Sequence, residues 1–350
     1  MTRNRSEALA LSLPLMLTQS RLPQEILVVD SSDDPRVNLA LVAKLAATTP
    51  VPLRHKVSPP GMTVQRNIGL AEVSTEVVFF PDDDSLVLPG ALAAMLRIYD
   101  LDHTGQIGGV CSAEAKTPPE GVFAATTTTT ATTAGYQMSL ADRLKAKIAR
   151  SRYALQDRLF RDPFHLCAER HYARLPAAPD WMAAENAILV PWMTGFRMSF
   201  RTELIRRRGF NEHLGRYALC EDIDAGFGIL QSHLLVGARN AQIYHHKAPE
   251  RRAGGRALGA MHILNRGYVL ACAGQTDAAM LAMLQRFSRY KIAQYALAAY
   301  SPFGRDAFGQ DRLAGARAAY RGLPALFAAA PDQLTPLYLG LRQRCFSSEI

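Results

Sequence analysis

Three consecutive aspartates, Asp82, Asp83 and Asp84, are the residues of this sequence best suited to bind a metal ion. They follow the apolar run of residues 77–80, a pattern typical of a strand buried in a parallel sheet. Open α/β sheets bind ligands beyond the carboxyl ends of their strands, and carboxylates there can hold Mg²⁺ or Mn²⁺, which in turn holds a diphosphate. The alternative is a solvated acidic turn that precedes the helix predicted after residues 89–90.

A second acidic loop follows the apolar run of residues 26–29. Parallel strands with a helix between them end at one edge of the sheet, so Asp30 is predicted to lie at the same edge as Asp82. Asp30 can accept hydrogen bonds from a nucleobase or a ribose, or it can simply close the strand through an Asx-turn. Arg66, in a predicted helix over residues 62–71, can reach a diphosphate at this edge, although such an arginine is more often an ordinary surface residue.

A third group of candidate residues lies in the second half of the chain. Glu221 and Asp222 open a predicted amphipathic helix, where the helix dipole favours acidic side chains and where a carboxylate can also take a proton from a hydroxyl group. Trp192 lies three residues before Gly195. A tryptophan beside a glycine offers a flat apolar surface with room for a sugar ring, and the alternative is a tryptophan of the core.

Composition limits the class of protein. A chain of 350 residues with 48% hydrophobic and 20% charged residues can form one large or two modest domains. We find no apolar run long enough to cross a membrane and no cleavage site typical of a signal peptide. Five scattered cysteines without paired spacing fit a reducing cytosol and disfavour a structural zinc site.

The net charge of +9 is concentrated in two stretches, residues 143–174 and residues 251–350. A basic surface can face nucleic acid, an anionic membrane or a phosphorylated substrate. Because no nucleic-acid-binding module accompanies the charge, we predict no nucleic-acid partner. A basic amphipathic helix over residues 140–160 either lies on a membrane or packs on the domain through its leucines. The Thr/Ala tract of residues 124–134 is predicted to be a loop.

The order of these segments resembles that of family-two glycosyltransferases with the GT-A fold. The resemblance rests on the segments TRNR (residues 2–5), EILVVDSSDD (25–34), GMTVQRNIG (61–69), DDD (82–84), WMTGFRMSFR (192–201) and EDID (221–224). It spans roughly residues 2–247 and is weakest in the middle. No single motif establishes the resemblance; it rests on the order and spacing of the motifs.

The resemblance implies a site for a nucleotide-diphospho-sugar donor of the UDP, dTDP or GDP type. In the family the first acidic loop contacts the nucleoside, which corresponds to Asp30. The acidic strand end binds the ribose and the metal-bound diphosphate, which corresponds to Asp82 and Asp84, and the implied cofactor is a divalent metal, Mn²⁺ or Mg²⁺. The family commonly has a histidine near this metal after the last strand, and His246 is our first choice for it, with His245 second.

The resemblance also implies an acceptor site and a catalytic base. The base of the family corresponds to Asp222, with Glu221 beside it, and the acceptor segment corresponds to Trp192 and Gly195. One departure concerns Gly228, which stands where the family often has an arginine.

The expected fold class is α/β of the GT-A type, a Rossmann-like and mainly parallel sheet flanked by helices, with a helical C-terminal extension. We expect a glycosyltransferase domain over residues 1–250, with a nucleotide-sugar half (1–115), a variable basic insert (116–180) and an acceptor half (181–250). Residues 251–350 are expected to form a basic helical region. The family usually has an apolar strand before the TRNR segment; here it is missing, which we attribute to a start codon assigned too late or to truncation.

The predicted function is inverting transfer of a sugar to a hydroxyl acceptor, a carbohydrate or a lipid-linked sugar, in cell-surface polysaccharide or glycolipid synthesis. The expected location is the cytoplasm, at the inner face of the membrane as a peripheral protein. Two alternatives remain open. One is a nucleotidyltransferase, and the other is a non-catalytic relative that binds nucleotide or carbohydrate.

Overall fold

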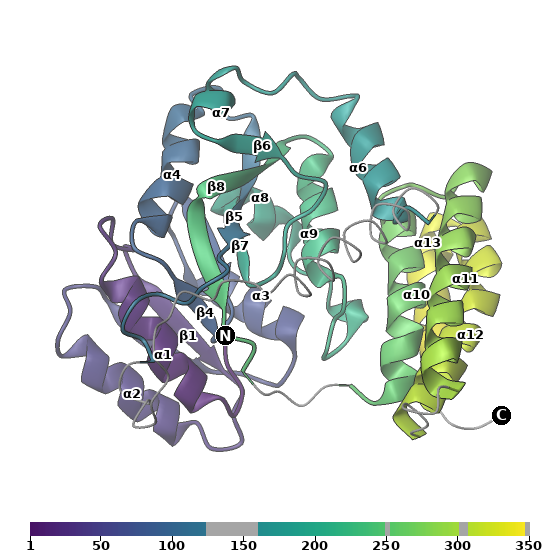
Figure 1. Ribbon diagram of the computed structural model, residues 1–350, viewed down its shortest axis with the longest axis horizontal. Helices are drawn as coiled ribbons and strands as arrows, with labels where there is room; N and C mark the ends of the chain where they lie inside the picture. The colour runs from purple at the N-terminus through teal and green to yellow at the C-terminus, as the bar shows by residue number, and fades with distance from the viewer. Residues whose placement is uncertain (124–159, 249–252, 301–306, 347–350) are drawn as a thin grey trace, which may run out of the picture. The chain divides into compact units, whose positions relative to one another are not determined.

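The computed structural model describes residues 1–123, 160–248, 253–300 and 307–346 (Figure 1). The chain divides into two compact units. Unit 1 consists of Met1–Pro119 and Ala168–Ala253, and unit 2 of Glu120–Cys167 and Gly254–Ile350. The Thr/Ala tract and nearly all of the helix predicted over residues 140–160 lie outside the described residues. The domain boundaries predicted from the sequence stay predictions.

The first part of unit 1 alternates helices and strands, as its apolar patterns predict. Its elements are α1 (Ser6–Leu17), β1 (Ile26–Asp30), α2 (Arg36–Ala46), β2 (Leu53–Val57), α3 (Met62–Glu72), β3 (Val77–Pro81), β4 (Ser85–Val87), α4 (Ala91–Leu101) and β5 (Ile107–Glu114). The second part contains α6 (Pro163–Tyr172), which begins in unit 2, then α7 (Trp181–Ala184), β6 (Ala187–Leu189), β7 (Arg197–Arg201), α8 (Thr202–Arg208), the short 3₁₀ helix η2 (Glu212–Leu214), α9 (Glu221–Leu230) and β8 (Leu234–His245).

The strands form two sheets. β1 pairs with β2 in parallel, and a six-stranded sheet has the order β3-β7-β5-β8-β4, with β6 also paired to β8. The α/β architecture with helices on the sheet is confirmed. The expected parallel pairing holds for β1–β2 and β5–β8, whereas β7 runs antiparallel to both β3 and β5. Because β7 runs antiparallel to β3, the segment that enters β7 lies beside the aspartates that follow β3.

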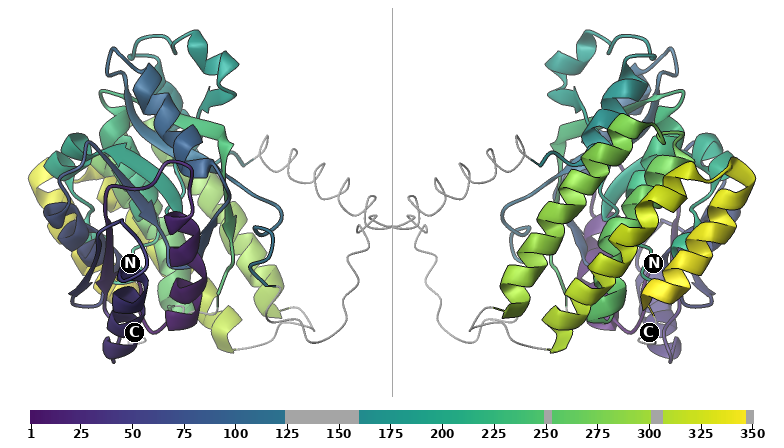
Figure 2. Two further views of the ribbon diagram at one scale, coloured as in Figure 1. Left: turned by 90° about the vertical axis from the view of Figure 1, so that its left-hand side faces the viewer. Right: turned by 90° about the vertical axis from the view of Figure 1, so that its right-hand side faces the viewer.

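Helices cover both faces of the sheets in unit 1. Helices α1 and α4 lie on one face and are both turned toward the viewer in the left view of Figure 2, whereas α3, α8 and α9 pack on the other. The core between α4 and the larger sheet includes Met95 and Ile98 of the helix and Val110 and Val236 of the strands, all nearly inaccessible to solvent. No strand lies between β1 and β3 in the described part of the chain.

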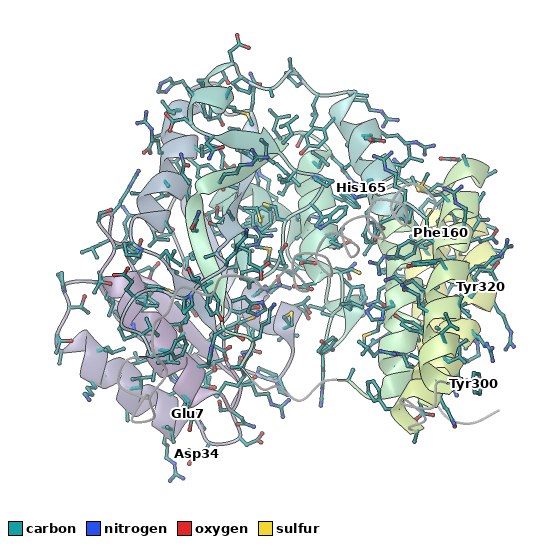
Figure 3. All side chains as sticks on the ribbon, viewed as in Figure 1. Glu7, Asp34, Phe160, His165, Tyr300 and Tyr320 are labelled. Carbon is teal, nitrogen blue, oxygen red and sulfur yellow. The ribbon has the colours of Figure 1, made fainter. Side chains whose placement is uncertain are left out.

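Unit 2 is helical. Its helices are α10 (Gly255–Cys272), α11 (Ala278–Tyr300), α12 (Ala307–Ala328) and α13 (Pro331–Phe346). A Cβ atom on Gly259 or on Gly315 would lie 1.9 Å from a backbone oxygen of the facing helix, so these glycines let α10 and α12 pack closely. Tyr300, 58% exposed, lies on the outside of this bundle (Figure 3). Among the described residues, no helix is both long and apolar enough to span a bilayer.

Candidate active site

The three aspartates form the turn between β3 and β4. The hydroxyl of Ser85 accepts a hydrogen bond from the backbone N–H of Asp82 and donates one to the carbonyl of Phe196, which fixes the turn against the segment that enters β7. The side chains of Asp83 and Asp84 are buried, whereas that of Asp82 is 27% exposed. Two carboxylates are therefore buried at the end of a strand, which requires compensating charge.

Arg5 supplies part of this charge. Its guanidinium lies 2.9 Å from Oδ1 of Asp83 and 2.5 Å from Oδ2 of Asp84. The hydroxyl of Thr2 donates a further hydrogen bond of 2.8 Å to Asp83. Burial nevertheless raises the pKa of Asp83 to about 6, against the effect of Arg5. Arg5 was not among the site residues predicted from the sequence, although it belongs to the TRNR segment on which the resemblance rests.

His245 is the histidine whose ring lies beside Asp84. Its Nε2 is 3.5 Å from Oδ1 of Asp84, and its ring stacks on Phe196 with 4.4 Å between centroids. His246 contributes its backbone N–H to the carbonyl of Asp84. Burial opposes ionisation of Asp84, but His245 and Arg5 together outweigh burial and lower its pKa. The structure thus brings our second choice, His245, to the acidic turn through its side chain.

The described residues contain no group of three or more histidine, cysteine or acidic side chains arranged to hold a metal ion. They do contain a buried carboxylate oxygen with room for a further partner, because Oδ1 of Asp84 faces Nε2 of His245 at 3.5 Å and makes no shorter hydrogen bond. Hard cations bound with nucleotides commonly take one or two protein carboxylates and complete their shell with phosphate oxygens and water. Asp84 and the partly exposed Asp82 fit such a shared site.

Arg66 connects the acidic turn to the second half of the chain. Its side chain is 2% exposed and pairs with Glu221, and its Nη2 lies 3.5 Å from Oδ1 of Asp82. Burial and the neighbouring charge of Asp222 raise the pKa of Glu221 to about 7, against the effect of Arg66. Arg66 of α3 therefore lies between two carboxylates, that of Asp82 after β3 and that of Glu221 at the start of α9.

Asp222 lies beside this ion pair. Its Oδ2 accepts a 2.9 Å hydrogen bond from the backbone N–H of Gly195, and its Oδ1 accepts one from Ile223. Burial raises its pKa, against the effect of Arg66, so its carboxylate is a stronger proton acceptor than a free aspartate. The backbone just before α9 is strained, because Ala218 and Cys220 adopt positive φ angles of 44° and 77°.

Gly195 packs closely against Arg66 and Glu221. A Cβ atom at this position would lie 3.0 Å from Nη2 of Arg66 and 3.1 Å from Oε1 of Glu221. Trp192, three residues earlier, is partly exposed rather than fully buried. The structure therefore brings Gly195 together with Glu221 and Asp222.

Asp30 is fully buried and bonds within its own loop. Its carboxylate accepts hydrogen bonds from the N–H of Ser32 and the amide of Asn38, both of 2.8 Å, and lies 3.1 Å from Nε2 of His55. The bond to Ser32, two residues on, is that of an Asx-turn. Burial opposes ionisation, but the hydrogen bonds from Ser32 and Asn38 prevail and lower the pKa of Asp30. The predicted role of Asp30 in nucleoside binding stays a prediction.

Asp224, on the first turn of α9, pairs with an arginine from another helix. Nη2 of Arg208, at the end of α8, lies 2.6 Å from Oδ2 of Asp224. The arginine passes directly over Gly228, where a Cβ atom would lie 1.7 Å from its Nε. Gly228, the glycine that departs from the family pattern, thus leaves room for Arg208 of α8. The ion pair of Arg208 with Asp224 holds the first turn of α9, which carries Glu221 and Asp222.

The carboxylate of Asp222, with its raised pKa, and the acidic turn after β3 therefore both lie close to the buried Arg66. This arrangement can accept a proton from a hydroxyl group and hold a cation and a diphosphate close to it.

Residues 1–150 match the model of glycosyl transferase family 2. The protein is a glycosyltransferase. The family match covers the part of the chain that contains Asp30, Arg66 and the acidic turn, and it confirms the resemblance on which the site was predicted. A search of curated proteins gives no match.

Solved structures resemble the fold of this glycosyltransferase at low sequence identity. S. aureus TarS 1-349 in complex with UDP-GlcNAc has a TM-score of 0.50 at 12% identity, over 98% of this chain and 88% of that one. The mannosyltransferase PcManGT from Pyrobaculum calidifontis, in complex with GDP-Man and Mn²⁺, has a TM-score of 0.48 at 16% identity. The match covers 98% of this chain and 84% of that one. The likeness to TarS confirms the predicted GT-A type of fold.

We predict that Gly228→Ala destabilises the glycosyltransferase by about 1–3 kcal/mol, because the added methyl group displaces the partly buried, ion-paired Arg208. In an Arg208→Ala background the same substitution should be neutral or slightly stabilising, since alanine favours the helix. Chemical denaturation of the four proteins of this double-mutant cycle measures the coupling. An equal cost in both backgrounds would contradict the role of Gly228.

We also predict a pH-dependent difference in stability between the wild type and Glu221→Gln. A carboxyl group with a raised pKa in the folded protein stabilises the fold when protonated. Its contribution is complete below the unfolded value of 4.5 and is lost as pH rises through about 7. The free energy of unfolding of the wild type, relative to Glu221→Gln, should therefore fall from about pH 5 to about pH 8. A constant difference over this range would show that Glu221 is ionised throughout.

Proposed function

We propose that the protein is an inverting glycosyltransferase that moves a sugar from a nucleotide-diphospho-sugar to a hydroxyl group. The observation that supports this most directly is the pair of contacts of Arg66, which pairs with Glu221 and lies 3.5 Å from Asp82. These contacts bring the proposed donor end of the sheet next to the proposed base, Asp222. Transfer in one displacement needs the two groups on opposite sides of one anomeric carbon, and therefore close together.

In the proposed reaction Asp222 takes the proton of the acceptor hydroxyl as its oxygen attacks the anomeric carbon. The bond between that carbon and the diphosphate breaks, and the nucleoside diphosphate leaves with the bonding electrons. The N–H of Gly195 holds Oδ2 of Asp222 and so orients the carboxylate. Trp192, partly exposed on the same segment, is the proposed contact for the acceptor sugar, together with Gly195.

The proposed donor contacts are Asp30 for the nucleoside, Asp82 for the ribose and Arg66 for the diphosphate. The proposed metal ligands are Asp82, Asp84 and His246, with His245, whose Nε2 lies 3.5 Å from Oδ1 of Asp84, as the second choice of histidine. A Mn²⁺ or Mg²⁺ ion bound there would neutralise the charge that develops on the leaving diphosphate. Such a cation would replace part of the charge that Arg5 now provides to Asp84.

The proposed acceptor is a cell-surface polysaccharide or a glycolipid, and the proposed location is the cytoplasmic face of the membrane. Support comes from basic side chains exposed on the helices of unit 2. They are Arg286 and Arg289 on α11 and Arg317 and Arg321 on α12. Exposed arginines favour contact with anionic surfaces.

A second candidate function is nucleotide or carbohydrate binding without transfer. It is favoured by Arg5, whose guanidinium already neutralises Asp83 and Asp84. Metal-dependent nucleotide binding without sugar transfer to a broad panel of acceptors would support it, and transfer to any acceptor of the panel would exclude it.

We predict a metal-dependent thermal shift with the matching nucleotide. UDP, GDP, dTDP and CDP, each with and without Mn²⁺, should give one selective rise in melting temperature for the wild type, because a bound ligand stabilises the folded state. Asp84→Asn should abolish the part of the shift that depends on Mn²⁺. Asp100→Asn, a change at a surface ion pair with Arg21, serves as the control and should behave as the wild type. A shift that persists in Asp84→Asn would remove Asp84 from the metal site.

We predict that Asp222→Asn lowers kcat by about 10²–10⁴-fold while nucleotide binding is retained, because the amide cannot accept the proton. The control is Asp100→Asn, at the surface ion pair with Arg21, which should leave kcat unchanged. A loss of nucleotide binding as large as the loss of rate would show that Asp222 belongs to the donor site and is not the base.

A further inference from the structure

Four basic side chains of unit 2 lie close to one another. They are His262 and Arg266 of α10, Lys291 of α11 and Arg312 of α12, and we call them the cation cluster. Each of the four is partly exposed, so none is sealed from solvent. Because like charges repel one another, cations that converge in this way need a compensating charge or a ligand that supplies one.

The first two members of the cluster, Arg266 and Lys291, share one aromatic ring. The guanidinium carbon of Arg266 lies 4.9 Å from the ring centroid of Phe287, and Nζ of Lys291 lies 5.6 Å from the same centroid. Burial lowers the pKa of Lys291 and the charge of Arg266 lowers it further, with Asp162 opposing both. The two cations are therefore close enough for one to disfavour the charge of the other.

The other two members, His262 and Arg312, meet at Tyr295. The hydroxyl oxygen of Tyr295 lies 2.6 Å from Nδ1 of His262, and the guanidinium carbon of Arg312 lies 4.5 Å from the ring centroid of Tyr295. Tyr295 follows Lys291 by four residues on α11, about one helical turn. In the same way Arg266 follows His262 on α10. The side chains of three helices thus converge on one place.

One carboxylate of the described residues forms an ion pair with this cluster. Oδ2 of Asp162 accepts hydrogen bonds of 3.2 and 3.0 Å from Nε and Nη2 of Arg266. Within the same described ranges neither Lys291 nor Arg312 forms an ion pair, and Nε of Arg312 is buried without a hydrogen bond. Aromatic rings attract cations but carry no net charge. Three cations against one carboxylate therefore leave two positive charges without a partner.

Asp162 is held in its position by aromatic contacts on both sides. The ring of Phe160 stacks on Tyr290 of α11 with 4.4 Å between centroids, and Phe160 is labelled in Figure 3. The ring of Phe164 lies 5.3 Å from the guanidinium carbon of Arg266. These contacts place the carboxylate of Asp162 at Arg266 and leave Lys291 outside ion-pair distance.

A phosphate group has the charge and the acceptors that the cluster lacks. A phosphate monoester carries about −1.5 to −2 charges at pH 7 and offers three acceptor oxygens, whereas a carboxylate carries a single charge. The guanidinium of Arg312 can donate two parallel hydrogen bonds to such oxygens, and the ammonium of Lys291 can donate another. When the hydroxyl of Tyr295 donates to Nδ1 of His262, the neutral ring has its proton on Nε2, which is a further donor.

We propose that the cation cluster of unit 2 is a binding site for a phosphate monoester group, with Lys291 and Arg312 as the ligands that neutralise its charge. The phosphate belongs to the head group of a membrane lipid or to a soluble phosphate ester, since both present the same terminal group. Arg266, paired with Asp162, borders the site and adds no net charge to it. The inference concerns unit 2 alone and does not rest on the proposed function.

The test measures the binding of inorganic phosphate to the full chain by isothermal titration calorimetry, in a metal-free buffer without nucleotide. Lys291→Gln/Arg312→Gln removes the two cations that lack a partner. The matched control, Lys44→Gln/Arg239→Gln, removes one lysine and one arginine at exposed positions of unit 1. We expect Kd to rise at least about tenfold in the first variant and to stay within about twofold of the wild type in the control.

An equal Kd in the wild type and in Lys291→Gln/Arg312→Gln would overturn the proposal, because the phosphate would then bind at another place. Lys291→Gln alone guards against a double variant that does not fold. It leaves the contact of Arg312 with Tyr295 in place, and it should still raise Kd at least about threefold. Melting temperatures without phosphate show that each variant is folded, and an unchanged Kd in a folded Lys291→Gln would also overturn the assignment.

Vesicles distinguish the two sources of the phosphate. Vesicles of phosphatidylcholine, with or without about 20% phosphatidic acid, are sedimented with each protein, because the head group of phosphatidic acid is a phosphate monoester. If the lipid is the source, Lys291→Gln/Arg312→Gln should lose retention on phosphatidic acid while Lys44→Gln/Arg239→Gln keeps it. Equal retention of the two variants, together with weakened binding of inorganic phosphate in the first, assigns the site to a soluble phosphate ester.

Discussion

The buried ion pair of Arg66 with Glu221 is the interaction on which the site depends. Burial of either partner alone would leave an uncompensated charge, and breaking such a pair is strongly destabilising. Arg66 comes from α3 and Glu221 from α9, with Gly195 packed against both. The ion pair and the glycine packed against it thus connect three segments that lie far apart in the sequence.

Charge compensation also explains why six acidic side chains can occupy this edge of the sheet. Arg5 balances Asp83 and Asp84, Arg66 balances Glu221 and Asp82, and Arg208 balances Asp224. Among the described residues no arginine forms an ion pair with Asp222, whose carboxylate accepts hydrogen bonds from the backbone N–H groups of Gly195 and Ile223. A base held by neutral donors keeps more affinity for a proton than one paired with a cation.

The division of the β-structure into two sheets sets a second constraint. Asp30 at the end of β1 and the acidic turn after β3 belong to different sheets, and the residues that connect them include Thr2 and Gln65. The side-chain amide of Gln65 donates to the carbonyls of both Thr2 and Val29. The relative position of these two acidic loops thus depends on a few side-chain contacts in place of a continuous backbone ladder.

The sequence by itself determined the strands after which the acidic residues lie, whereas it placed Asp30 and Asp82 at one edge of a single sheet and the structure divides β1 and β3 between two sheets. Apolar runs followed by acidic turns predicted β1 and β3, since a short apolar run bounded by turn residues is typical of a buried strand. Motif order then identified the family, which the match over residues 1–150 confirms. Only the tertiary structure decided which charges pair, because partners such as Arg5 with Asp84, or Arg208 with Asp224, lie far apart in the chain and their spacing carries no signal. It likewise decided that the ring of His245 lies beside Asp84, since that depends on the stacking of this ring on Phe196.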